Sequence, residues 1–288
     1  MLASSKTQRF CGALAPSTTG CAALLAALCL ATEPALAQSA SSWVKGPLSS
    51  VRLISGGLQN GVWRAGVEIS LKSGAHTYWR FPGDSGVPPT FDFAGSANLK
   101  DTRVSFPLPE RLDEAGMQIF GYKSDVVFPL AVTPNDASKP VVVALHFQYA
   151  ACEKICMPAE ARLKFTLDPR NSSKANLARI EQFAARVPKP LGDSGSPLIK
   201  VAAGTAGEKK TWQVSIEPAG GKAEDLIAEG PDGWIFDTKR QSPGRFLVTL
   251  AEKPTDATGK TPPVTLTVVT DKGAFEGVRH LDAGGATP

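Results

Sequence analysis

Short apolar segments separated by turn residues are the feature that most constrains the fold of this chain. The sequence of 288 residues contains 27 Gly and 23 Pro, which punctuate it too often for a fold of long helices. Residues 62–71 partly alternate apolar and polar side chains, as a strand with one buried face does. Similar segments cover 76–81, 99–106, 126–132, 141–149 and 162–167. Their number and spacing predict an antiparallel, all-β sandwich in this part of the chain.

A different pattern follows the predicted sandwich. Leu177, Ile180, Phe183 and Val187 recur at helical spacing, which predicts one amphipathic helix lying on the sandwich over about 173–187. The stretch after Val187 is rich in Pro, Gly and Ser, as linkers are.

Strand-like segments then return, with polar loops expected at 203–210 and 251–263. The segments lie at 212–216, 234–236, 245–250 and 264–270. We therefore expect an immunoglobulin-like sandwich over 38–170, the helix and linker over 171–197, and a second, smaller β-sandwich-like domain over 198–288.

Residues 1–37 have the three parts of a secretory signal peptide. Lys6 and Arg9 supply positive charge, Gly20–Ala31 supplies a short apolar run, and Ala35-Leu36-Ala37 offers a cleavage site. An apolar run of about a dozen residues is too short to span a bilayer of roughly 30 Å as a helix. The rest of the sequence has no longer apolar run. We expect export to the periplasm and no transmembrane segment in the mature chain.

The charge pattern does not favour a nucleic-acid partner. The formal net charge is +4, and the sequence has no block of Lys or Arg longer than two residues. Proteins that bind polyanions usually concentrate positive charge on one surface or segment. We therefore expect no nucleic-acid partner.

Cleavage of the signal peptide would leave Cys152 and Cys156 as the only cysteines. Two cysteines this close in an exported protein are expected to pair. A disulfide needs Cα atoms about 4.4–6.8 Å apart, whereas an extended chain would separate these residues by about 13 Å. One helical turn would bring them to about 6 Å. The strand ending near Tyr149 must therefore turn, and Pro158 keeps that turn from continuing as a helix.

The small loop between the cysteines favours a redox role. Closing so short a loop removes little conformational entropy from the unfolded chain, so the bridge would be a poor structural crosslink. One alternative is a copper(I) site, because Cys152, Cys156 and Met157 are soft ligands and His146 is a further donor. Another is a serine protease, because Gly83-Asp84-Ser85-Gly86 resembles a nucleophile segment. No His stands in a matching context, and we expect an ordinary turn there.

The cysteine segment Cys152–Glu160 is accompanied by two further distinctive stretches, Thr77–Gly86 and Gly121-Tyr122. The cysteine segment resembles that of the N-terminal periplasmic domain of DsbD-type protein-disulfide reductases, especially their ScsB-like branch. Thr77–Gly86 resembles that branch's Tyr-Trp-Arg-x-Pro-Gly-Asp-x-Gly segment, and Gly121-Tyr122 falls between the two in the expected order. Together the matches cover about residues 43–168.

The resemblance implies an immunoglobulin-like sandwich that works by thiol–disulfide exchange and needs no cofactor. By family position, Cys156 would bond the partner and Cys152 would resolve the mixed disulfide. A loop upstream of the cysteines would cover the site, with Phe120 and Tyr122 as candidate shields. The alternative is that both are core aromatics of a strand. Tyr78 is expected mainly to pack in the core.

The resemblance also implies the partners. They are a membrane-embedded, CcdA- or DsbD-like thiol reductase as donor, and thioredoxin-like or client proteins of the periplasm as acceptors. Cytochrome c biogenesis and copper tolerance are the associated processes.

The chain departs from full-length family members. It has no polytopic membrane region and no Cys-x-x-Cys motif, and its cysteine spacing is shorter than the x5 spacing of the best-known branch. We expect a separate membrane protein to reduce Cys152 and Cys156. The alternative is a non-catalytic protein that binds copper(I) or docks clients through these cysteines.

Overall fold

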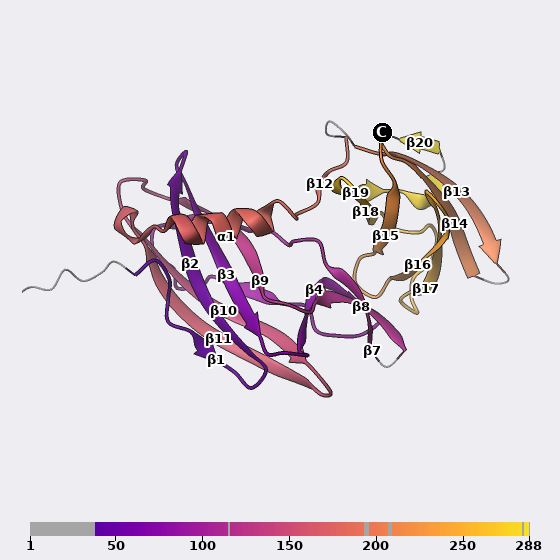
Figure 1. Cartoon of the computed structure of the whole chain (residues 1–288). Helices are drawn as coiled ribbons and strands as arrows, with labels where there is room; N and C mark the ends of the chain where they lie inside the picture. The colour runs from indigo at the N-terminus through magenta and orange to yellow at the C-terminus, as the bar shows by residue number, and fades with distance from the viewer. Residues whose placement is uncertain (1–37, 115, 193–195, 207–208, 284, 288) are drawn as a thin grey trace, which may run out of the picture. The chain divides into compact units, whose positions relative to one another are not determined.

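The computed structural model describes residues 38–114, 116–192, 196–206, 209–283 and 285–287, so the predicted signal peptide lies outside the described residues. The described residues form four β-sheets, the α-helix α1 (Lys174–Ala184) and the short 3-10 helices η1 (Pro169–Asn171) and η2 (Leu281–Ala283) (Figure 1). The predicted all-β class is therefore confirmed. Within these residues, no helix has the length and apolar character needed to cross a membrane.

Two antiparallel sheets form an immunoglobulin-like sandwich in the N-terminal part of the described chain. One sheet has the strand order β1-β2-β3-β9-β6, and the other has the order β11-β10-β4-β8-β7, with β5 pairing to β10. The strands are β1 (Val44–Lys45), β2 (Ser49–Gln59), β3 (Val62–Leu71), β4 (His76–Gly83), β5 (Thr90–Asp92), β6 (Leu99–Val104), β7 (Glu110–Glu114), β8 (Met117–Tyr122), β9 (Val126–Pro134), β10 (Val141–Cys152) and β11 (Cys156–Leu167).

Side chains from both sheets fill the interior of this sandwich. Trp63, Val67 and Ile69 on β3 are spaced two or four residues apart and are almost fully buried, as expected for one face of a strand. Phe128 of β9 and Phe147 of β10 bring aromatic rings from the two sheets together, with centroids 6.4 Å apart. Burying one such side chain contributes about 1.5–3 kcal/mol, so this core fixes the strands that carry the functional site.

The predicted amphipathic helix is present and packs on β2, β3 and β9. Ser173 caps it, because the side-chain oxygen accepts a hydrogen bond from the backbone N–H of Asn176. Ile180 and Phe183 are buried and join the hydrophobic core of the sandwich. The helix ends at Ala184, before Val187, the last residue of the predicted apolar stripe.

The second β domain also consists of two sheets, with strand orders β12-β19-β18-β15 and β16-β17-β14-β13-β20. Trp212, Val214, Phe246, Val248 and Leu266 are the centre of its separate core. The strands are β12 (Lys189–Pro190), β13 (Leu198–Ala206), β14 (Lys209–Glu217), β15 (Ala223–Glu229), β16 (Ile235–Ser242), β17 (Arg245–Glu252), β18 (Val264–Thr270), β19 (Gly273–Arg279) and β20 (Gly285–Thr287).

Two segments that sequence analysis assigned to loops or linker take part in sheets. Most of the expected loop at 203–210 belongs to the paired strands β13 and β14. Residues 203–205, 209 and 210 are exposed, which hides the strands from the hydrophobic pattern, while backbone pairing does not depend on side-chain polarity. Lys189–Pro190, inside the expected linker, forms β12 and pairs in parallel with β19.

Candidate functional site

Strands β10 and β11 form a hairpin whose tip carries both cysteines. Cys152 ends β10 and Cys156 begins β11; they are partners in the strand register, their Cα atoms lie 4.0 Å apart, and a disulfide joins them. The expected turn is present, but it is the hairpin loop Glu153–Ile155 and not a helical turn. Cross-strand pairing brings two residues as close as a helical turn does, and the helical geometry was therefore the wrong prediction.

The two cysteines differ sharply in exposure. Cys152 is completely buried, whereas Cys156 is exposed. Ile155, which precedes Cys156 at the tip of the hairpin, is 76% exposed. Of the two cysteine residues, Cys156 is therefore the accessible one.

Tyr78 and Glu114 contact the disulfide. The Tyr78 hydroxyl oxygen lies 3.1 Å from the Sγ atoms of both Cys152 and Cys156. Its single proton is donated to Oε2 of Glu114, which is 2.9 Å away and is the strongest acceptor of the three. The other carboxylate oxygen, Oε1, lies 3.2 Å from Sγ of Cys156. The disulfide thus has a hydroxyl and a carboxylate directly beside it.

A turn after β4 leaves room for the Tyr78 ring. Gly86 has a φ of +110°, and a Cβ atom there would lie 2.4 Å from that ring. Asp84 ties the turn to β8, because its backbone N–H donates to the carbonyl of Gln118 and its carboxylate accepts from the backbone N–H of Gln118. The Gly83–Gly86 segment is therefore a structural turn, as expected, and not a protease nucleophile.

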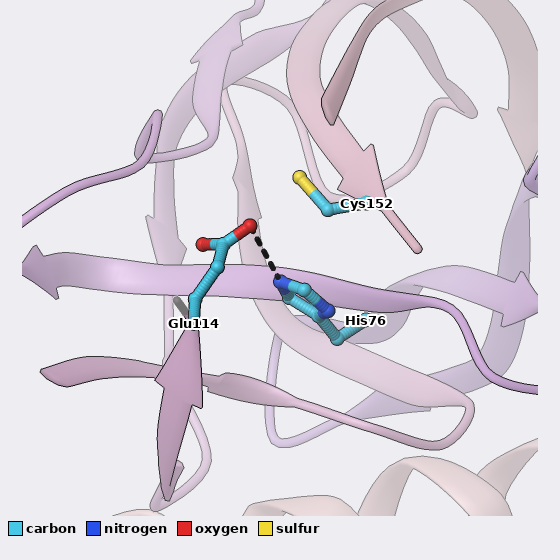
Figure 2. A group of neighbouring side chains, drawn as sticks. All are labelled: His76, Glu114 and Cys152. Atoms are coloured by element: carbon cyan, nitrogen blue, oxygen red, sulfur yellow. Dashed lines mark ion pairs between the residues drawn. The ribbon is translucent and has the colours of Figure 1, made fainter. Parts of the chain in front are cut away.

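His76 stands beside this group. It pairs with Cys152 in the register between β4 and β10, and its ring meets that of Tyr78 edge-on with centroids 5.5 Å apart. Its Nε2 atom is buried, lies 3.8 Å from Oε1 of Glu114, and has no hydrogen-bond partner among the described residues. Figure 2 shows His76, Glu114 and Cys152 converging from β4, β7 and β10.

Burial sets the protonation of the two aromatic side chains. Desolvation lowers the pKa of His76 below its ordinary value, and the nearby Glu114 carboxylate offsets only part of this effect. Burial, followed by the hydrogen bond to Glu114 and its charge, raises the pKa of Tyr78. At neutral pH the imidazole is neutral and the tyrosine hydroxyl keeps its proton.

The structure places the two candidate shields in the core of the sandwich. Phe120 packs against Trp79 and Phe81, and the Tyr122 hydroxyl donates to the carbonyl of Pro107 at 2.7 Å. Ile119, the residue before Phe120, shares a small buried cluster with Cys152. Because neighbouring residues of a strand point to opposite faces, Phe120 and Tyr122 face away from that cluster.

Met157 and His146, the further copper ligands considered, do not join the sulfur atoms. Met157 follows Cys156 in β11, so its side chain points to the opposite face of the strand. His146 lies six residues before Cys152 on β10, roughly 20 Å along the strand at about 3.3 Å per residue. Its Nε2 atom is 2.9 Å from Glu160 Oε1.

His76 and Glu114 were not predicted as site residues from the sequence, and Tyr78 was predicted to pack in the core. A signal for two of them exists, because His76 and Tyr78 are two residues apart in a predicted strand and must share a face. Glu114 has no comparable signal. Its place beside Cys156 depends on how β7, β8, β4 and β10 pair across the sheet.

Comparisons with known proteins agree with this picture. Residues 54–168 match the family model described as "Thiol:disulfide interchange protein DsbD, N-terminal". The structure is similar to the crystal structure of the N-terminal periplasmic domain of ScsB from Proteus mirabilis, with a TM-score of 0.64 and 21% sequence identity. That similarity covers 84% of this chain and 98% of the other, and at this identity it shows the shared fold. A comparison with curated protein sequences found no match. Residues 54–168, which include the disulfide, Tyr78 and Glu114, are therefore a DsbD-type N-terminal domain of the thiol:disulfide interchange family.

Proposed function

We propose that this protein is a periplasmic thiol–disulfide exchange protein. It takes reducing equivalents from a membrane-embedded, CcdA- or DsbD-like thiol reductase and passes them to thioredoxin-like or client proteins through Cys152 and Cys156. The observation that carries the proposal is the contrast between the exposed Cys156 and the fully buried Cys152 of one disulfide. Exchange needs one sulfur that a partner reaches and a second that resolves the mixed disulfide.

The exchange cycle is balanced in electrons and protons. In the reduced protein, the Cys156 thiolate attacks a client disulfide, forms a mixed disulfide and releases one client thiolate. The Cys152 thiolate then attacks the Cys156 sulfur, which forms the Cys152–Cys156 disulfide and releases the second client thiolate. The client gains two electrons and, from solvent, two protons. The membrane reductase restores the dithiol by the reverse sequence and is itself oxidised to a disulfide.

Tyr78 and Glu114 supply polar contacts for this chemistry. When a partner thiolate attacks Cys156, negative charge develops on the departing Cys152 sulfur, 3.1 Å from the Tyr78 hydroxyl. When this charge develops, the hydroxyl can turn its proton from Glu114 to that sulfur, and the new hydrogen bond stabilises the buried thiolate. Glu114 Oε1, 3.2 Å from Cys156 Sγ, is within reach of the thiol proton of the reduced protein.

Single-cysteine variants test the proposal. Each variant is reduced and mixed with a purified, oxidised thioredoxin-like periplasmic protein, and dithiothreitol-sensitive adducts are separated by non-reducing electrophoresis. Cys152→Ser should accumulate the mixed disulfide because it lacks the resolving thiol. Cys156→Ser should yield about tenfold less, because its remaining thiol is buried.

Two results would count against the proposal. Equal adduct from both variants would contradict the assignment of Cys156 as the attacking residue. Failure of both variants, with correctly folded protein, would contradict exchange itself and favour the alternative of a fixed disulfide in a docking protein.

A further inference from the structure

The residues around the disulfide include donors of three chemical types. Donor atoms of His76, Glu114 and Cys152 all lie within 4.8 Å of one another (Figure 2). Cys156 adds a fourth donor, because its Sγ lies 3.2 Å from Glu114 Oε1 and is bonded to that of Cys152. Once the disulfide is reduced, the group offers two thiolates, one imidazole and one carboxylate.

This donor set suits Zn²⁺. Structural zinc sites are tetrahedral, with Zn–S bonds of about 2.3 Å and Zn–N or Zn–O bonds of about 2.0–2.2 Å, so their ligand atoms lie roughly 3.3–3.8 Å apart. For a nitrogen and an oxygen ligand the expected separation is about 3.3–3.6 Å, and the distance of 3.8 Å between His76 Nε2 and Glu114 Oε1 is only slightly longer. The donor atoms of His76, Glu114 and Cys152 lie within 4.8 Å of one another, so they have to close by no more than about 1–1.5 Å. The sulfurs of Cys152 and Cys156 move apart once their bond is broken. Copper(I) prefers sulfur ligands and gains little from a carboxylate.

His76 Nε2 is buried and is not held by a close carboxylate. It lies 3.8 Å from Glu114 Oε1, beyond hydrogen-bond distance, whereas His146 Nε2 lies 2.9 Å from Glu160 Oε1. Tyr78 completes the surroundings, because its hydroxyl contacts both sulfurs and Glu114. Metal sites commonly have such an outer hydrogen-bond donor that orients the ligands.

We propose that the reduced protein binds one Zn²⁺ through Cys152, Cys156, His76 and Glu114, and that disulfide formation abolishes this site. A dithiol or phosphine reductant supplies two electrons, which break the S–S bond and leave two thiols. Zn²⁺ then replaces the two thiol protons, which pass to solvent. The inference rests on the proposed function in one respect, because the site exists only after the pair has been reduced.

Zinc would compete with exchange at this site. A Zn²⁺-bound thiolate shares its electron pair with the metal and is a poorer nucleophile toward a client disulfide. The exposed position of Cys156 gives the ion a route to the buried donors. The ion would hold the pair reduced and inactive until a chelator or a competing partner removes it.

The test uses purified protein, reduced with a phosphine, freed of metal and kept anaerobic. Thiols are counted first. The number of Zn²⁺ ions bound per molecule is then measured by competition with a chromogenic chelator. Co²⁺ is added in parallel, because its absorption spectrum reports thiolate ligation and tetrahedral geometry. We expect one Zn²⁺ per reduced protein, about 100-fold weaker binding by the oxidised protein, and a thiolate-to-cobalt absorption band.

Variants identify the ligands. His76→Ala and Glu114→Gln should each weaken Zn²⁺ binding about tenfold or more. His146→Ala and Glu160→Gln should leave it unchanged, because they remove a similar His–Glu pair on β10 and β11 that lies away from the sulfurs.

The outcomes separate the inference from the proposed function. A reduced pair that binds no Zn²⁺, or binds it independently of His76 and Glu114, would overturn the zinc site and leave exchange intact. Binding of copper(I) alone would also overturn it. If the Cys152–Cys156 disulfide cannot be reduced while the protein is folded, both the zinc site and the exchange function are contradicted.

Discussion

Tyr78 is the residue at which the contacts around the disulfide converge. Its hydroxyl touches both sulfurs and donates to Glu114, its ring packs against that of His76, and Gly86 leaves space for the ring. The raised pKa of Tyr78 keeps the hydroxyl protonated at neutral pH, so it stays a hydrogen-bond donor. Tyr78 is therefore a part of the site and not only of the core.

Phe120 is predicted to stabilise the sandwich without controlling access to the cysteines. Phe120→Ala removes a 5% exposed ring that packs against Trp79 and Phe81. We expect a loss of about 3–5 kcal/mol in the free energy of unfolding, measured with urea. At urea concentrations well below the midpoint of unfolding, reduced Cys156 of the variant should be alkylated at the same rate as in the wild type. Several-fold faster alkylation of a still stable variant would instead support a shielding role.

The residues of the candidate site differ in how well they could be predicted from the sequence. Cys152 and Cys156 were predictable because the predicted export and the cysteine count leave few other roles for them. His76 was missed although it shares a strand face with Tyr78. Glu114 could not be predicted, because the sequence of β7 does not show that this strand joins the sheet of β10 through β8 and β4. Site residues from one strand are predictable, and those that depend on sheet order are not.

At the scale of elements, hydrophobic periodicity located most strands of the sandwich. The bounds of β3 and β18 equal the predicted ones. β2 was missed because Ser55, Gly56 and Gly57 interrupt its pattern, although the strand is buried through Gly57. Strand β2 is covered on both faces, one of them by α1. A strand buried on both faces lacks the alternation of apolar and polar side chains by which a strand is predicted.

The type of turn between the two cysteines could not be predicted from the local sequence. The need for a turn followed from the spacing of Cys152 and Cys156, because an extended chain cannot bridge them. Its type did not follow, since a helical turn and a hairpin both bring the two residues together. Pairing of the whole of β10 with β11 decides between them, and this pairing is a property of the sheet.

The tip of this hairpin is predicted to contact protein partners. Ile155→Asp places a charge at an exposed apolar residue next to Cys156. We expect exchange with an oxidised thioredoxin-like protein to slow about tenfold, equivalent to about 1.4 kcal/mol. Reduction by dithiothreitol, a small molecule that needs no docking surface, should be unchanged.

Val278→Asp is the matched control for this variant. Val278 is 58% exposed in the second β domain, and its substitution should alter neither rate. Equal slowing by the two substitutions would show a general charge effect. An Ile155→Asp protein with wild-type exchange rates would exclude the hairpin tip as a contact surface.

At the scale of the whole molecule, the comparisons extend beyond the matched family domain. The family model covers residues 54–168, whereas the structural similarity to the ScsB domain covers 84% of the chain. The second β domain has its own hydrophobic core and belongs to the fold class expected from its strand-like segments. The sequence predicted that architecture. Strand β12 of this domain was not predicted, because it lies in a Pro-rich stretch that has the composition of a linker.

The reduction potential of the Cys152–Cys156 pair tests the central claim most directly. The purified protein is equilibrated in metal-free glutathione or dithiothreitol buffers of known potential, and alkylated thiols are counted after quenching. Exchange proteins have potentials between roughly −180 and −270 mV, and we predict a value in this range. A potential well below about −300 mV would mark the bridge as a structural disulfide and contradict the account.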